Sequence, residues 1–153
     1  MSEVERIVDQ LRRAFEGNAW HGLALWEILT DVTSQQAVNK PLSGAHSIWE
    51  IVNHIIVWES VVLRRIKGEI IGGLSPEQDW PPVSDSSESA WQKTLDSLER
   101  GNRQLRETIS GLTDDRLKET VLGQTYSIYH MLHGVVQHDL YHAGQIAVLK
   151  KGR

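Results

Sequence analysis

Apolar residues recur at helical spacing in four stretches of the chain, and no stretch shows the alternation that is typical of a β-strand. The four stretches are residues 4–29, 46–67, 85–110 and 127–151. Gly17 and Asn18 interrupt the first stretch, so we expect a kinked or broken helix there. An N-cap at Asp85, Ser86 or Ser87 begins the third helix. The pattern predicts an all-α protein built as a four-helix bundle.

The connections between these helices differ in character. Residues 31–45 are polar and predict a loop, with room for one helical turn begun by Thr33 or Ser34. Residues 113–117 have a capped start and suggest another short turn. Residues 68–85 lack periodicity and predict a long crossover between the second and third helices. Fully extended, this crossover would reach ~59 Å against ~33 Å for the second helix, so it can return along the bundle and leave helices two and three parallel.

The composition is that of a soluble globular protein, with 40% apolar and 24% charged residues among 153. A chain of this length can bury a substantial core without disulfides or a structural metal, and we expect a single domain covering residues 1–153. There are no cysteines, which excludes disulfides, cysteine-based zinc sites and protein thiol nucleophiles. A metal site would have to use histidines and carboxylates.

The charge pattern excludes some classes of partner. With 16 Lys and Arg against 20 Asp and Glu, the formal net charge is -4, and basic residues do not collect in one stretch. This balance speaks against nucleic acid as a partner. No run approaches the ~18 apolar residues of a membrane span, and charges interrupt the N-terminal segment where a signal peptide would be apolar. We therefore expect a cytoplasmic protein that binds neither nucleic acid nor membrane.

The most informative pattern is a helical seam in the last stretch, where polar residues occupy core positions. The seam consists of Ile128, Met131, Val135, His138, His142, Gln145 and Leu149. His138 and His142 are four residues apart, so their imidazoles project from one face and can converge on one point. His54 occupies a core position of the second helix at a similar depth in the bundle. Three neutral imidazoles can hold a divalent transition metal and leave coordination positions open.

Spacing alone does not establish such a site. Seven histidines placed at random in this chain would give about 0.3 pairs four residues apart, so short histidine motifs often arise by chance. The alternative is that each is a core histidine bonded to a neighbouring carbonyl or hydroxyl. Of the other histidines, His130 and His133 lie on other faces of the last helix, and His46 lies near the start of the second.

Five further residues are candidates for the pocket or for a second layer around the metal: His21, Glu50, Trp58, Asp139 and Gln145. Trp58 follows His54 by one helical turn and is placed to wall a pocket. Glu50 precedes His54 by one turn, as a partner of the ligand or a general base. Asp139 or Gln145 is placed to orient the ligands, and His21 to reach the pocket rim.

Two strings in the chain resemble the DinB-like superfamily of metal-dependent bundle proteins. They are HSIWEIVNHIIVWE at residues 46–59 and QHDLYHAGQIAVLKK at residues 137–151, and NAWHG at residues 18–22 resembles a motif in one branch. The resemblance implies a four-helix bundle of up-down-down-up topology, usually a homodimer. It also implies zinc or nickel bound through one histidine of the second helix and two of the fourth, which here are His54, His138 and His142.

The same resemblance bears on activity. Characterised relatives include transferases that use a low-molecular-weight thiol, and many members have no known activity. We therefore expect a metal-dependent enzyme that acts on a small molecule by thiol transfer or hydrolysis. The alternative is a non-catalytic dimeric bundle whose metal or histidine site binds a small molecule or stabilises the fold.

Overall fold

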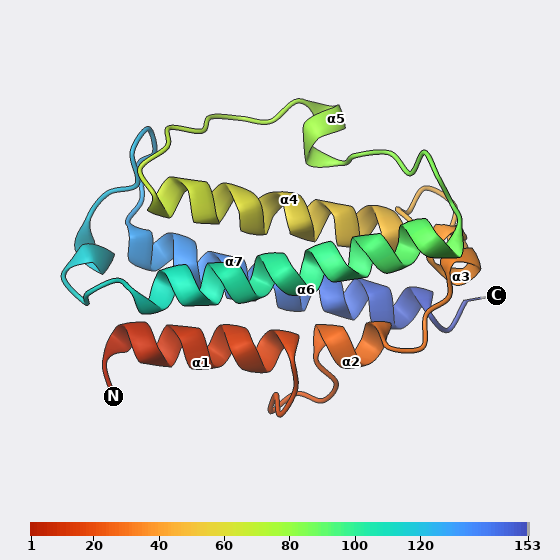
Figure 1. Ribbon diagram of the computed structural model, residues 1–153, viewed down its shortest axis with the longest axis horizontal. Helices are drawn as coiled ribbons and strands as arrows, with labels where there is room; N and C mark the ends of the chain where they lie inside the picture. Colours follow the sequence, from red (N-terminus) through yellow and green to blue (C-terminus); the bar gives the residue numbers. More distant parts are fainter. Residues whose placement is uncertain (153) are drawn as a thin grey trace.

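The computed structural model describes residues 1–152, and all its named elements in that range are helices. The four long helices are α1 (Glu3–Phe15), α4 (Ile48–Ile66), α6 (Glu88–Ser110) and α7 (Ile128–Leu149) (Figure 1). The short ones are α2 (Leu25–Leu29), α3 (Ser34–Val38), α5 (Pro76–Asp79) and the 3-10 helix η1 (Arg116–Lys118). The expected all-α class is confirmed. The expected domain ends at residue 153, which lies outside the described residues.

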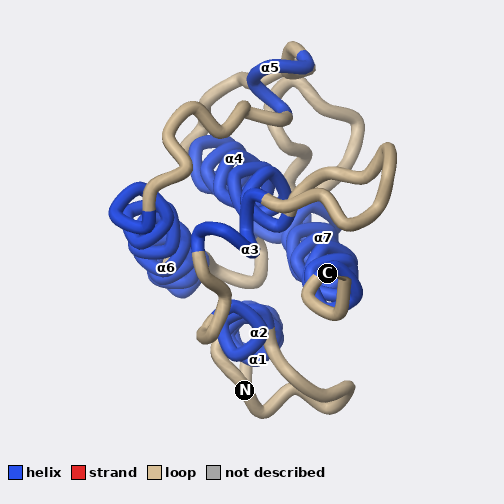
Figure 2. Tube along the Cα trace, turned by 90° about the vertical axis from the view of Figure 1, so that its right-hand side faces the viewer, coloured by secondary structure: helices blue, strands red, loops and turns tan. Residues whose placement is uncertain are grey.

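The long helices pack side by side. Helix α4 packs against both α6 and α7, and α1 packs against the same two helices from the opposite side. Figure 2, which looks along the helices, shows α4, α6, α7 and the α1–α2 column as separate columns around a common centre. This packing brings the second and fourth predicted helices, which carry the seam histidines, into direct contact.

Serine and threonine caps explain where the helices begin. Each cap hydroxyl accepts a hydrogen bond from the backbone N–H three residues on, which satisfies one of the free amides of the first turn. The capping residues are Ser2, Thr33, Ser47, Ser75, Ser87 and Ser127. Ser87 is thus the N-cap among the three expected candidates, and Thr33 begins the extra turn in the first loop.

The first predicted helix is broken, as expected. Helix α1 ends at Phe15, and the chain then passes through Gly17 and Asn18 before α2 begins at Leu25. Asn18 has φ of 59°, a left-handed conformation that asparagine tolerates better than most residues. Figure 1 shows α2 continuing roughly in line with α1 on the far side of this loop.

The connection between α4 and α6 runs along the outside of α4 (Figure 1). Figure 2 shows the same segment on the outer side of that helix. The expectation of no periodicity missed one feature, the helical turn α5, which Ser75 caps and Pro76 begins. Proline suits this position because its fixed φ favours a first helical turn and its missing N–H would be unpaired there anyway.

The core has two apolar halves separated by a polar layer. One half contains Phe15, Leu25, Ile55, Trp91, Leu98 and Ile146, and the other contains Ile7, Leu11, Val62, Leu105, Ile109 and Leu132. The buried polar residues between them are His54 and Glu59 on α4, Asn102 on α6, and Asp139 and His142 on α7. Within residues 1–152, no helix has an apolar run long enough to cross a bilayer.

Truncation in the apolar core should be costly, whereas truncation on the surface should not. Leu98 is fully buried, so Leu98→Ala should lower the free energy of unfolding by ~2–5 kcal/mol through lost burial and a residual cavity. Arg100→Ala, on the exposed face of the same helix, should change it by less than ~0.5 kcal/mol. Urea unfolding monitored by circular dichroism tests both values, and equal effects would contradict this packing.

Candidate metal centre

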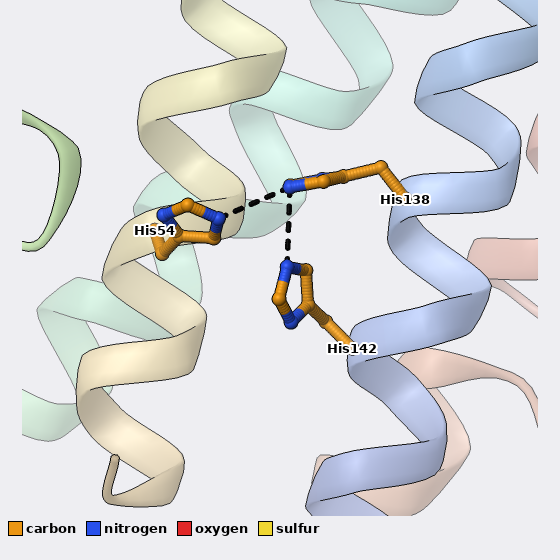
Figure 3. Close-up of side chains that lie close together, drawn as sticks. All are labelled: His54, His138 and His142. Carbon is orange, nitrogen blue, oxygen red and sulfur yellow. Dashed lines mark hydrogen bonds between the residues drawn. The ribbon is translucent and has the colours of Figure 1, made fainter. Parts of the chain in front are cut away.

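Three imidazoles meet at the centre of the polar layer. The Nε2 atom of His138 lies 3.1 Å from Nε2 of His54 and 3.1 Å from Nε2 of His142. Figure 3 shows the ring of His54 facing the two rings from α7. One nitrogen from each ring lies within 4.8 Å of the other two, and His54 and His142 are buried while His138 is half-buried.

The crossover segment orients His54. Its Nδ1 atom lies 2.8 Å from the main-chain oxygen of Asp79 and 3.1 Å from that residue's Oδ1. The indole N–H of Trp58 donates to the same carboxylate at 2.7 Å. The ring of Trp80 stacks between those of His54 and His46, with centroids 3.8 and 3.6 Å away. Because both oxygens near Nδ1 are acceptors, that nitrogen carries the proton and Nε2 presents a lone pair.

The two α7 histidines are held differently. Nδ1 of His142 lies 2.6 Å from Oε1 of Gln145, so this nitrogen also carries the proton and Nε2 presents a lone pair. Nδ1 of His138 is buried without a hydrogen-bond partner among the described residues. Burial, followed by the neighbouring imidazoles, lowers the pKa of His138 to about 4, and burial lowers the pKa of His142. Both rings are therefore neutral at pH 7.

The hydrogen bonds leave an electrostatic problem that a cation solves. His138 can donate one Nε2 proton to one neighbour, so at least one of the two 3.1 Å contacts sets two lone pairs against each other. Three imidazole nitrogens bound tetrahedrally at ~2.0–2.1 Å would lie about 3.3–3.4 Å apart. The two separations from His138, both 3.1 Å, are close to this value. The donor set and its spacing fit a divalent transition metal, and the bonds at Nδ1 are those expected around ligating histidines.

Cavities flank the cluster on two sides. One, of about 260 Å³, is lined by Trp58, His138 and Gly134 among others. The other, of about 610 Å³, is lined by Trp80, His142 and Gly144 among others. Both glycines lie inside α7, and an added Cβ at either would meet nothing within 4 Å. A glycine inside a helix costs ~1 kcal/mol relative to alanine, but here it leaves space beside a histidine.

Comparison with known proteins identifies the family of the chain. The family model of the DinB superfamily matches residues 19–146, which include all three histidines. The chain belongs to the DinB superfamily. No curated protein and no solved structure matches the chain significantly.

A buried carboxyl pair lies beside the histidines of this DinB-superfamily protein. Glu59 and Asp139 are almost fully buried, and Asn102 donates from Nδ2 to Oε1 of Glu59 at 2.7 Å. Burial raises the pKa of Glu59 to about 7. Burial and the adjacent Glu59 raise the pKa of Asp139 well above its usual range. The pair therefore retains a proton near neutral pH, because two adjacent buried charges would repel each other.

The remaining candidates from the sequence occupy different places. Gln145 contacts His142 directly. The ring of Trp58 lies beside that of His138, and its N–H binds Asp79, which in turn contacts His54. Asp139 follows His138, but its Oδ1 lies 4.0 Å from the ring Nδ1, and its carboxyl interacts with Glu59. Glu50 does not reach the cluster.

Glu50 and His21 have other surroundings. Glu50 caps α4 through the backbone N–H of Ser47, at 2.8 Å, and pairs with Lys40 at 3.0 Å. His21 is exposed and lines a separate cavity between the α1–α2 loop and α7.

Sequence reasoning missed four residues around the site: Asp79, Trp80, Glu59 and Asn102. The first two lie in the aperiodic crossover, where no pattern indicates which side chains turn inward. Asn102 was visible as a polar residue in an apolar seam, but its partner Glu59 was not. The turn signal of Ser75 and Pro76 could have located the bend that brings Asp79 to His54.

The carboxyl pair should make stability depend on pH. Glu59 has a folded pKa of about 7, above the ordinary 4.5, so its contribution to stability is present below 4.5 and is lost as the pH rises through about 7. Glu59→Gln cannot ionise and should therefore show a smaller loss of stability over this range. Chelator-treated proteins unfolded in urea at a series of pH values test this, with the more exposed Glu99→Gln as control. Parallel pH profiles of Glu59→Gln and the unmutated protein would contradict it.

Proposed function

We propose that this DinB-superfamily protein binds a divalent transition metal through His54, His138 and His142 and uses it to act on a small molecule. The observation that carries the proposal is the convergence of three Nε2 atoms, two of which are unprotonated because acceptors bind the opposite nitrogen. Such a site has three protein ligands, which is typical of catalytic zinc sites, whereas structural ones usually have four.

The chain's own residues would hold and orient the metal. Asp79 and Gln145 fix the ring orientations of His54 and His142, and Trp80 restricts the His54 ring by stacking. A bound metal would supply a Lewis acid that favours the deprotonated form of a water or thiol. Since the chain has no cysteine, a reacting thiol would come from a small molecule. The cavities on two sides of the cluster favour thiol transfer between two bound molecules over hydrolysis.

Several finer features belong to the same proposal. Three histidines suit zinc or nickel, and a low-molecular-weight thiol would be the second cofactor. We also propose the up-down-down-up bundle of the family, supported by the long connection that lets α4 and α6 begin at the same end in Figure 1. We further propose that the protein is a homodimer, as the family resemblance implies, and that it acts in the cytoplasm.

A non-catalytic role is the second candidate. The histidines lie in the polar layer between two apolar halves of the core, so a bound cation could stabilise the fold by satisfying them. In this reading, the site would bind a small molecule or hold the helices together, without turnover.

Metal analysis tests the ligands. We expect about one divalent metal per chain, removable by a chelator. The double substitution His138→Ala, His142→Ala should abolish this load, because two of three ligands are lost. His133→Ala, on the same helix but outside the cluster, should retain it. A full load in the double variant would show that the ligands lie elsewhere.

The variant His54→Ala separates the catalytic from the structural role. It should lose metal yet remain a folded helical protein, with a loss of stability of ~0.5–3 kcal/mol, since it removes no large apolar group. Circular dichroism and thermal unfolding of the metal-loaded, chelated and His54→Ala proteins provide the measurement. Collapse of the helical signal on chelation at ~25 °C would favour the structural role, as in small zinc domains that unfold without metal.

A further inference from the structure

A buried arginine, Arg65, lines the smaller of the two cavities beside the histidine cluster. His138 and Trp58 line one part of this cavity of about 260 Å³, and Arg65 and Tyr126 line another. The side chains between are mostly apolar: Val62, Met131 and Val135. Arg65 follows Trp58 by about two helical turns, which corresponds to ~10 Å along α4. The cavity therefore extends from the candidate metal centre towards Arg65.

Arg65 has an uncompensated charge. Its residue exposure is 7%, and its Nε atom is buried without a hydrogen-bond partner. Its Nη atoms donate to neutral oxygens, the hydroxyl of Tyr126 at 2.8 Å and the main-chain oxygen of Ile71 at 2.6 Å. No carboxylate among residues 1–152 forms an ion pair with it, whereas the adjacent Arg64 pairs with Glu69 at 2.8 Å. Buried charges are normally paired, because removing an ion from water is costly.

A purely structural role does not account for this arginine. The main-chain oxygen of Ile71 also accepts a hydrogen bond from Nε2 of Gln124 at 3.1 Å. The neutral side chain of Gln124 therefore already links the loop before α7 to the start of the crossover. The full positive charge of Arg65 is not needed for that contact, although the residue lines a mostly apolar cavity.

We propose that the cavity binds a small molecule with an anionic group, which Arg65 recognises, while the other end of the molecule lies at the histidine cluster. The group is a carboxylate or a phosphate, since both match the planar donors of a guanidinium. The apolar walls suit a short aliphatic body between the two ends. This inference rests on the proposed function and adds to it the charge and approximate length of one substrate.

The test compares thiols that differ in charge. Mercaptopropionate, mercaptoethyl phosphate and neutral mercaptoethanol are titrated into cobalt-substituted protein, and binding is followed by thiolate-to-cobalt absorption. We expect the preferred anionic thiol to bind about 10- to 100-fold more tightly than mercaptoethanol, as a buried charge-assisted hydrogen bond allows. The preferred anion distinguishes a carboxylate from a phosphate substrate.

Two arginine variants test whether Arg65 causes the preference for anionic over neutral thiols. Arg65→Met removes the charge at similar side-chain length and should abolish the preference while leaving cobalt content and mercaptoethanol binding unchanged. Arg64→Met makes the same change one residue away, at an exposed side chain, and should keep the preference. Equal binding of charged and neutral thiols by the unmutated protein would overturn the proposal. A preference that persists in folded Arg65→Met would overturn it too.

Two further measurements cover failure of folding or of metal binding. If circular dichroism shows Arg65→Met to be unfolded, the uncharged but polar Arg65→Gln replaces it, and an undiminished preference in that variant overturns the proposal. If the unmutated protein binds no cobalt, the proposed metal function fails by itself. Propionate and inorganic phosphate are then titrated into metal-free protein and followed by the Gly134 amide resonance. A saturable shift that Arg65→Gln weakens supports the anion site, whereas no shift, or a shift that this variant leaves unchanged, overturns it.

Discussion

The contact between His54 of α4 and the histidine pair of α7 organises the middle of this molecule. It lies in a polar layer that divides the core. Helices α4, α6 and α7 each contribute to this layer a buried polar residue, which lies between the two apolar halves of the core. Glu59 does so on α4, Asn102 on α6 and Asp139 on α7. Burying polar groups is costly unless they are satisfied, so the two apolar halves must stabilise the fold on either side of this layer. A cation at the histidines would relieve the conflict between the facing nitrogen lone pairs within it.

Helix α7 combines two requirements that oppose each other. Its buried residues hold the bundle together, yet Gly134 and Gly144 weaken it and leave room beside His138 and His142. Flanking α4 and α1 offset this weakness, because packing rather than intrinsic propensity stabilises most helices in folded proteins. The same helix can therefore present both ligands and border a cavity on each side of them.

The crossover between α4 and α6 does more than connect two helices. It brings Asp79 and Trp80 to the outer side of His54, where one accepts its Nδ1 proton and the other stacks on its ring. Its first residues also pass over the buried Arg65, which donates to the main chain at Ile71. One loop thus touches both the candidate metal centre and the candidate anion site, so changes in the loop would affect both.

Local physics allowed the sequence by itself to determine the four long helices, the region in which the third one is capped, the interruption at Gly17 and Asn18, and the seam that aligns His138 with His142. Periodicity, cap chemistry and glycine conformations act within one or two helical turns, so they are readable along the chain. Only the tertiary structure decided that Asp79, rather than Glu50, orients His54, that Asp139 lies beside Glu59, and that His21 lies away from the cluster. These contacts join residues far apart in sequence through an aperiodic loop or across facing helices. Their partners depend on how the helices are rotated and offset against one another, which no local pattern specifies.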